Sequence, residues 1–329
     1  MSLFKNGARY NSIGPYLSGL FGRRTFKAAI DGGFTCPNRD GTKGWGGCIY
    51  CSEKGSGEYA GLITEGRSAD GRITVPVRSE EVLPAPPSLQ MESQLAFIQK
   101  KWQDPLIIAY FQNFTNTYAP VERLEALYSE ALRFPGCVGL AIATRPDCID
   151  DKVLNLLERL NEKTFLWVEL GLQTSSDQTA ELINRGCSMQ DYEDCTDRLT
   201  RAGIKYVTHL MFGLPGETRE TMLRSVEDIC RGDLFGIKLH MLYILKHTAI
   251  EKKWEEGLVP LMSQEEYISL ICDALERIPR HVTIHRLTGD APGDLLLAPL
   301  WAQYKRDVLN GINREMKRRG SVQGCRVPE

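Results

Sequence analysis

Short apolar runs recur along the chain, and segments with helical spacing of apolar residues alternate with them. The runs lie at residues 25–31, 106–111, 138–143, 164–170, 205–212 and 236–244. The helical segments lie at residues 88–103, 121–134, 151–160, 177–184, 189–202 and 219–231. Strands covered by helices read as near-continuous apolar runs, so this pattern predicts a parallel α/β sheet. Six such units fit a partial (βα)6, TIM-like barrel, with an open doubly wound sheet as the alternative.

The alternation stops near residue 250. Ser263 and Glu266 form a capping-box pattern at the start of a helix over 263–277. A short strand is expected at 281–287, and an amphipathic helix with a basic outer face at 300–319. We therefore expect a core domain over residues 1–250 and a C-terminal α+β extension over 251–329 that caps or extends the sheet or faces the substrate. Residues 52–87, rich in Gly, Pro, Ser and charge, predict a long irregular excursion.

Three cysteines lie in the Gly-rich stretch CPNRDGTKGWGGCIYC at residues 36–51. Eleven residues separate Cys36 from Cys48, and two separate Cys48 from Cys51, a spacing that lets two thiolates bind one metal centre. Three thiolates are one short of the four ligands of structural zinc. They suit an iron–sulfur cube in which one iron is left open. On this stretch alone, zinc with a distant fourth ligand is an equally good interpretation.

Polar residues lie within or directly after the predicted strands, where parallel βα folds place their chemistry past the carboxyl ends. They are Gln112, Asn113, Thr144, Arg145, Glu169, Gln173, His209, Lys238 and His240. Each has an ordinary structural explanation: a histidine is often a hydrogen-bonded core residue, and Arg145 has Asp147 as a neighbouring partner. Together with the cysteine stretch they favour a small polar cofactor above the sheet.

Composition narrows the class of protein. The chain has 329 residues, 42% hydrophobic and 25% charged, which is typical of a globular protein. No apolar run approaches the roughly 20 residues needed to cross a bilayer, and the N-terminus lacks the apolar stretch of a secretory signal. Ten cysteines are too dilute for a disulfide scaffold, so a reducing cytoplasm is the expected compartment.

Charge is almost balanced over the whole chain but not at its ends. Forty Lys and Arg against 42 Asp and Glu leave a net charge of −2. Residues 1–30 contain five basic residues and no acid, and residues 300–329 contain seven basic residues and three acids. Two basic ends are compatible with a nucleic-acid surface, although charge alone slightly favours solvated helix faces.

Five motifs carry a resemblance to a known superfamily over roughly residues 20–245. They are CPNRDGTKGWGGCIYC (36–51), TRPD (144–147), ELGLQT (169–174), NRG (184–186) and HLMFGLPGET (209–218). The chain resembles the radical S-adenosylmethionine (SAM) superfamily, and within it the YhcC/YtqA family, related to the Elongator catalytic subunit and to oxygen-independent coproporphyrinogen oxidase. The commonest spacing of the superfamily is C-x3-C-x2-C. The longer first gap is shared by the Elongator-like and YhcC-like groups.

The resemblance implies a set of cofactor contacts. Cys36, Cys48 and Cys51 would hold a [4Fe–4S] cluster whose open iron is chelated by SAM, and one-electron reduction would cleave SAM to a 5′-deoxyadenosyl radical. The expected SAM-binding residues are Tyr50 at the adenine, Gln112 and Asn113 at the amino group, Gln173 at the ribose and Arg185 at the carboxylate, with Thr144 and His209 as further contacts. Such an enzyme is sensitive to oxygen.

The resemblance to Elongator also implies a substrate, the C5 side chain of the wobble uridine in tRNA. Glu169, Lys238 and His240 are the candidate catalytic residues, and Arg286 and Asp290 are further candidates for binding the substrate. Aromatic residues that could stack a flipped base are Trp45, Tyr59, Phe114 and Tyr118.

Other functions remain open at this point. A radical SAM enzyme could act on a small metabolite instead of tRNA, or the cysteine stretch could belong to a non-catalytic, zinc-stabilised RNA-binding module. The enzyme interpretation implies a one-electron donor such as flavodoxin or ferredoxin and no membrane. The sequence does not indicate an oligomeric state.

Overall fold

The computed structural model describes residues 3–55, 57, 60–61 and 84–328. Most of the predicted irregular excursion at 52–87 lies outside the described residues, and so does Tyr59.

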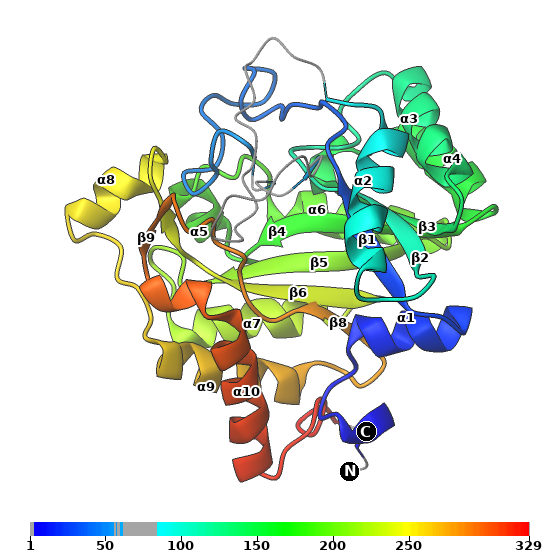
Figure 1. The fold of residues 1–329 in the computed structure, drawn as a ribbon. Helices are drawn as coiled ribbons and strands as arrows, with labels where there is room; N and C mark the ends of the chain where they lie inside the picture. Colours follow the sequence, from blue (N-terminus) through cyan, green and yellow to red (C-terminus); the bar gives the residue numbers. More distant parts are fainter. Residues whose placement is uncertain (1–2, 56, 58–59, 62–83, 329) are drawn as a thin grey trace.

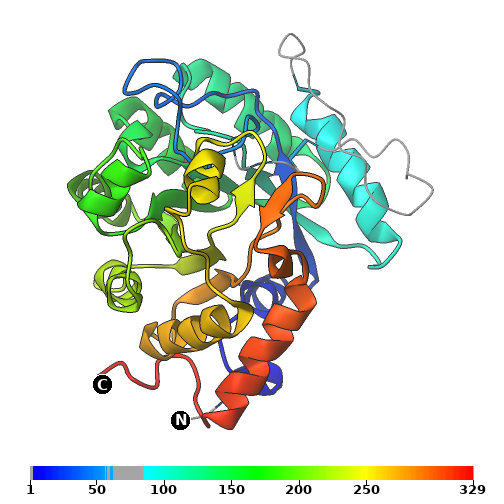
Figure 2. The ribbon, with the colours of Figure 1, turned by 90° about the vertical axis from the view of Figure 1, so that its left-hand side faces the viewer.

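A seven-stranded parallel sheet forms the centre of the molecule and curls into a partial barrel with helices around its outside (Figures 1 and 2). Its order is β1-β2-β3-β4-β5-β6-β8. The strands are β1 (Thr25–Ile30), β2 (Leu106–Phe111), β3 (Cys137–Thr144), β4 (Phe165–Gln173), β5 (Lys205–Phe212), β6 (Gly236–Met241) and β8 (Thr283–Arg286). All six predicted strands are present and pair in chain order, so the predicted partial TIM-like fold is confirmed.

The C-terminal part adds a seventh strand to this sheet. β8 pairs parallel to β6, so the sheet continues across the expected boundary at residue 250. The division into 1–250 and 251–329 stays a prediction. The sixth predicted run is interrupted, because β6 ends at Met241 and a separate two-residue strand, β7 (Ile244–Leu245), pairs antiparallel with β9 (Leu296–Ala298).

Eight of the ten α-helices in the described residues follow predicted segments, and α1 and α8 were not predicted. The ten helices are α1 (Ile13–Phe21), α2 (Pro87–Gln99), α3 (Val121–Arg133), α4 (Asp151–Asn161), α5 (Asp177–Leu182), α6 (Met189–Arg201), α7 (Arg219–Ile229), α8 (Ala249–Glu255), α9 (Gln264–Arg277) and α10 (Lys305–Arg318). The capping box predicted at Ser263 and Glu266 is present at the start of α9. Among the described residues, no helix has both the length and the apolar character needed to cross a bilayer.

Three apolar clusters form among the described residues, and the two that pack on the faces of the sheet leave one end of the barrel open for chemistry. The larger layer packs the outer face of the sheet against the surrounding helices. The smaller layer lies inside the barrel, where Ile13 and Leu17 of α1 pack with Tyr110 and Trp167. α1 contacts both β1 and β8, the two edges of the sheet, so it closes the barrel at the amino ends of the strands. The carboxyl ends remain for polar side chains.

Candidate active site

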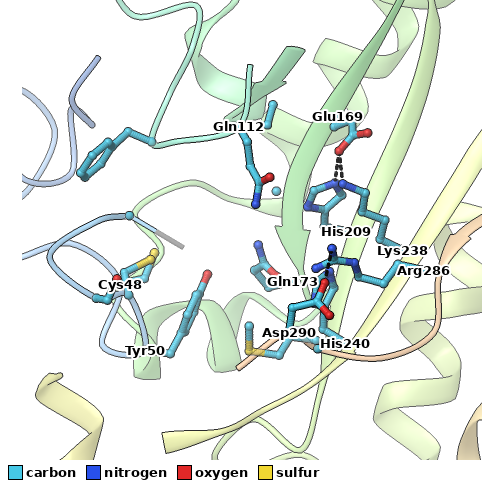
Figure 3. Close-up of a pocket in the computed structure, with 18 of the residues that line it drawn as sticks. Cys48, Tyr50, Gln112, Glu169, Gln173, His209, Lys238, His240, Arg286 and Asp290 are labelled. Carbon is cyan, nitrogen blue, oxygen red and sulfur yellow. Dashed lines mark hydrogen bonds and ion pairs between the residues drawn. The ribbon is translucent and has the colours of Figure 1, made fainter. Parts of the chain in front are cut away.

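A cavity of about 770 Å³ lies at the carboxyl ends of the strands. Figure 3 shows Cys48 and Tyr50 on one side of it and Glu169, Lys238 and Arg286 on the other. The predicted site residues on its wall are Cys36, Cys48, Cys51, Tyr50, Gln112, Thr144, Glu169, Gln173, Arg185, His209, Lys238, His240, Arg286 and Asp290. The volume is toward the upper end of the roughly 300–1,000 Å³ of small-molecule sites, which leaves room for more than one small ligand.

Some predicted residues do not line this cavity. Asn113 is buried next to it, at 4% exposure, with its side chain against Gly57. Phe114, by contrast, does line the cavity and lies beneath the guanidinium of Arg39. Trp45 is 75% exposed outside the wall, and the hydroxyl of Tyr118 is bonded to that of Thr42 at 2.7 Å.

The cysteine stretch folds into a tight loop whose turns face the cavity. The Cys51 N–H donates to the Cys48 carbonyl at 3.0 Å, and the Gly47 N–H donates to the Asn38 carbonyl at 2.8 Å. Gly47 has a positive φ of 73°, which few other residues adopt without strain. A Cβ on Gly44 would collide with the side chain of Asn38. Glycine at these points therefore brings the first cysteine back toward the C-x2-C pair.

The chemistry of these three thiols fits an iron–sulfur cube. All ten cysteines lie in the described part of the chain and have free thiols. A hydrogen bond with Cys51, acting against burial and helped by Tyr50 and the charges of Arg145 and Arg185, lowers the pKa of Cys48 to about 6. Within the described ranges no three Cys, His, Asp or Glu side chains converge as ligands of a single ion. In a cube each cysteine binds a different iron, so convergence on one point is not required.

Several of the expected SAM contacts lie between the cysteines and the far wall. Figure 3 places Gln112 and Gln173 in this middle region, facing the space beside Tyr50. Gln173 ends β4 with a positive φ of 69°, an uncommon conformation for a residue with a side chain. Thr144 shares a 2.6 Å hydrogen bond between its hydroxyl and that of Thr117. These positions are compatible with the expected adenosine contacts, which remain predictions.

Arg185 has a structural role that the sequence did not indicate. Its guanidinium is buried and donates to the carbonyl oxygens of Leu172, of Thr174 at 2.6 Å, and of Cys187 at 2.7 and 2.9 Å. These bonds join the end of β4 to the turn after α5. The side chain also lines the cavity, so the expected contact with the SAM carboxylate stays a prediction.

A buried charge network forms the far wall, with Glu169 at its centre (Figure 3). Glu169 has no exposed surface, and its carboxylate accepts from Lys238, from Lys27 at 3.3 Å, from the Trp167 indole at 3.0 Å and from His209 at 3.0 Å. Burial alone would raise the pKa of Glu169, but the two ammonium groups and His209 hold it well below its usual range. Glu169 is therefore ionised at neutral pH.

Two lysines share this single carboxylate. Both ammonium groups also lie over the ring of Tyr110, at 4.9 Å for Lys27 and 4.5 Å for Lys238 from the ring centroid. Burial lowers the pKa of Lys238 well below its usual range, against the attraction of Glu169, and burial likewise lowers the pKa of Lys27. Burial also lowers the pKa of His209 to about 4. At neutral pH the His209 ring is therefore uncharged, whereas Glu169 carries its negative charge.

The far wall carries surplus positive charge. Its cations are Lys27, Lys238, Arg286 and Lys305, and its anions are Glu169 and Asp290. Asp290 is already paired, at 2.7 Å with Arg286 and 2.9 Å with Lys305. Among the described residues of this wall, four cations against two carboxylates leave a net charge of +2, or +1 if one lysine releases its proton. Chemically, the wall is suited to bind an anionic group.

Sequence reasoning missed Lys27, Tyr110 and Trp167 as parts of this network. Lys27 was visible as a lone charge in the middle of an apolar strand, two residues before Ala29 on the same face. The two aromatic residues gave no comparable signal, because buried strands contain such residues routinely.

Comparison with known proteins agrees with the fold and shows the class of enzyme. Residues 36–229 match the Radical SAM superfamily, and residues 235–318 match the Radical_SAM C-terminal domain. The chain belongs to the radical SAM superfamily and is an enzyme of that class, whose cofactors are a [4Fe–4S] cluster and SAM.

Within the superfamily the chain belongs to the family of YtqA and YhcC. It is 43% identical to YtqA of Bacillus subtilis over 96% of this chain and 92% of that protein. It is 34% identical to YhcC of Escherichia coli K12 over 95% of this chain and 94% of that protein. The predicted family is confirmed.

Two more distant matches involve Elongator-like proteins. The tRNA uridine(34) acetyltransferase of Methanocaldococcus jannaschii is 29% identical over 49% of this chain and 30% of that protein. The solved structure of an N-terminally truncated Elp3 of Methanocaldococcus infernus has a TM-score of 0.64 and 22% identity, covering 72% of this chain and 60% of that one. At this identity the structural match supports the fold alone.

Proposed function

We propose that this radical SAM enzyme acts on tRNA and modifies the C5 side chain of the wobble uridine. Cys36, Cys48 and Cys51 would hold the cluster, and Tyr50, Gln112 and Gln173 would contact SAM. Bound together, cluster and SAM would supply a one-electron reductive cleavage of SAM and a 5′-deoxyadenosyl radical able to abstract a hydrogen atom. The proposal retains the expected reducing cytoplasm and an external electron donor such as flavodoxin or ferredoxin.

The partial relative supports the choice of nucleoside. Its name assigns it to uridine 34 of tRNA, and its similarity covers about half of the present chain. The matched region is only 30% of that protein, so we do not propose that the present chain transfers an acetyl group. The present chain contains a radical SAM region, and radical chemistry at a nucleoside side chain is an activity that such a region can supply.

The observation that carries the proposal is the charge of the far cavity wall. Lys27, Lys238 and Arg286 line the same cavity as the three cysteines, with Glu169 and Asp290 neutralising only part of their charge. A flat pyrimidine has no charge to match this wall. A uridine whose C5 side chain carries an anionic group has one, and that side chain is where hydrogen abstraction would occur.

The buried network would then hold the side chain and move a proton. The Lys238 ammonium lies between the Glu169 carboxylate and the Tyr110 hydroxyl. It donates to both, with a distance of 2.8 Å to the Tyr110 oxygen. Glu169 remains ionised and orients both lysines, and burial lowers the pKa of Lys238, which makes its ammonium a better proton donor than that of an exposed lysine. His240 lines the cavity with its pKa lowered by burial, so it would act as a neutral ring.

Comparing the nucleosides of bulk tRNA from wild-type and deletion strains tests the proposal. We expect one C5-modified uridine to be lost and an unconverted precursor to accumulate, with restoration by the wild-type gene but not by Cys36→Ala. The reconstituted protein should convert the precursor in isolated tRNA from the deletion strain. Unchanged nucleosides would contradict a tRNA substrate and leave the small-metabolite alternative. Reduction-dependent formation of 5′-deoxyadenosine would separate either enzyme from a non-catalytic RNA-binding module.

A further inference from the structure

A buried ion pair follows β3 at the side of the cavity, in the TRPD segment at residues 144–147. The Arg145 guanidinium donates to both carboxylate oxygens of Asp147, at 2.9 and 3.0 Å. Arg145 is 8% exposed, and the Asp147 side chain is 5% exposed. A bidentate guanidinium–carboxylate pair of this kind fixes orientation as well as charge.

Lys43 of the cysteine loop completes the pair to a triad. Its ammonium contacts the Asp147 carboxylate at 2.7 Å and the Asp147 carbonyl oxygen at 3.0 Å. The segment after β3 is thereby tied to the middle of the loop, between the first cysteine and the C-x2-C pair. This contact spans 104 residues of sequence, and neither cavity lining nor core packing requires it.

The triad also connects to the turn after α5. The remaining donors of Arg145 bond the carbonyl oxygens of Arg185 at 2.6 Å and Gly186 at 2.9 Å. The same turn returns to the cysteine loop, since the Asn184 side-chain amide donates to the Gly47 carbonyl at 2.8 Å. Asn38 of the loop donates back to the Asn184 carbonyl at 2.6 Å. Loop, β3 segment and turn therefore form a closed ring of polar contacts.

The charge of the triad acts on the cysteines. Two cations and one carboxylate leave it one positive charge in excess. Arg145 lines the same cavity as Cys36 and Cys48, and the polar ring fixes its charge next to the cysteine loop. Net charge and solvent exposure around an iron–sulfur cluster are among the factors that set its reduction potential. A nearby positive charge favours the reduced cluster, which carries one more electron.

We propose that Lys43, Arg145 and Asp147 are positioning residues that also set the reduction potential of the iron–sulfur cluster. The ring holds the loop in place, and the net charge of the triad raises the potential. This proposal depends on the iron–sulfur cluster of the enzyme class and not on the identity of the substrate. A failure of the proposed action on tRNA would therefore leave it unaffected.

Two single substitutions change the charge of the triad in opposite directions. Asp147→Asn removes a negative charge, so we expect a more positive midpoint potential. Lys43→Met removes a positive charge at nearly equal length, so we expect a more negative one. The shift for Asp147 should be the larger, because its side chain is 5% exposed and that of Lys43 is 40% exposed, where water screens the charge.

The measurement is an anaerobic redox titration of the reconstituted full-length protein without SAM, followed by electron paramagnetic resonance of the reduced cluster. Asp151→Asn is the matched control, because Asp151 is also paired with an arginine, Arg198 at 2.6 Å, but has no contact with the cysteine loop. Its potential should equal that of the wild type.

The directions of the two shifts in midpoint potential distinguish an electrostatic role of the triad from a purely structural one. A purely structural role would lower the iron content of both variants without moving the two potentials in opposite directions. Equal potentials in the wild type and in Lys43→Met, or shifts of the same sign in both variants, would overturn the proposal. If Asp147→Asn does not fold, Lys43→Met still decides, because this half-exposed lysine lies on the surface of the loop.

Discussion

Replacing Glu169 by glutamine tests the buried charge network most directly. The substitution keeps the size of the side chain but removes the carboxylate that Lys27 and Lys238 share. Glu169 has no exposed surface, so water cannot replace the lost charge. Removing one partner of a buried ion pair costs about 3–5 kcal/mol, since the remaining charge is left without compensation.

This cost corresponds to a measurable loss of thermal stability. Unfolding entropy is roughly 2.1 cal/mol/K per residue, so a chain of this length loses about 1.4 °C in Tm per kcal/mol. We therefore expect Glu169→Gln to lower Tm by about 4–7 °C at pH 7, measured by circular dichroism under reducing conditions. Because the folded pKa of Glu169 is depressed, its contribution is present above the unfolded pKa of about 4.3 and is lost as pH falls below it.

Two further variants make the result interpretable. Glu125→Gln is the matched control: Glu125 pairs with Arg159 at 3.4 Å on the surface, where such pairs contribute about 0–1 kcal/mol. Glu169→Gln combined with Lys238→Met should recover at least half of the lost Tm, because it removes one of the uncompensated ammonium groups. If Glu169→Gln is no less stable than Glu125→Gln at pH 7, the network does not carry the charges assigned to it.

Three other predictions concern separate parts of the site. Asn184 has a positive φ of 53° and bonds Gly47, so Asn184→Ala should be about 1 kcal/mol less stable in urea unfolding than Asn184→Gly, which tolerates that φ. Burial raises the pKa of Glu217 to about 7, although its hydrogen bond with Thr174 opposes the shift. Because the folded protein then holds this proton more tightly than the unfolded chain, the free energy of unfolding of the wild type should fall relative to that of Glu217→Gln as pH rises from 5 to 8, measured by urea unfolding. Lys27→Met should lower tRNA conversion by about 10- to 100-fold, with SAM cleavage in the absence of tRNA unchanged, because a hydrogen bond to a charged group contributes roughly 1.5–3 kcal/mol.

The sheet could be predicted from sequence because its strands are buried on both faces. Continuous apolar runs mark such strands, and all six were found within a few residues of their ends. The helix α1 was not predicted, because Gly14, Pro15 and Gly19 all argue against a nine-residue helix. It forms where Ile13 and Leu17 pack into the barrel, a tertiary effect that no local pattern carries.

The candidate site was predicted unevenly for a related reason. Strand ends and cysteine spacing are local features, so the three cysteines and many of the polar residues of the cavity wall were found from them. The partners within the wall are not local: Glu169 joins residues from β1, β5 and β6, separated from it by 142, 40 and 69 positions. Which of several buried charges compensate each other depends on side-chain geometry, and a sequence contains no record of that geometry.

Arg185 illustrates why a motif can identify a residue and still leave its role open. The NRG motif suggested one task, an ion pair with the SAM carboxylate, yet the guanidinium already bonds three carbonyl oxygens that hold the turn after α5 in place. A guanidinium has five N–H donors, so a structural and a ligand-binding role can coexist on one side chain. The backbone of this turn also accepts a hydrogen bond from Arg145. Arg185 therefore connects the expected SAM site to the triad of Lys43, Arg145 and Asp147. A lysine at this position would keep the positive charge but could not make the same set of hydrogen bonds to three carbonyl oxygens. Arg185 is therefore required to hold the turn after α5 in place, whether or not it also binds a ligand.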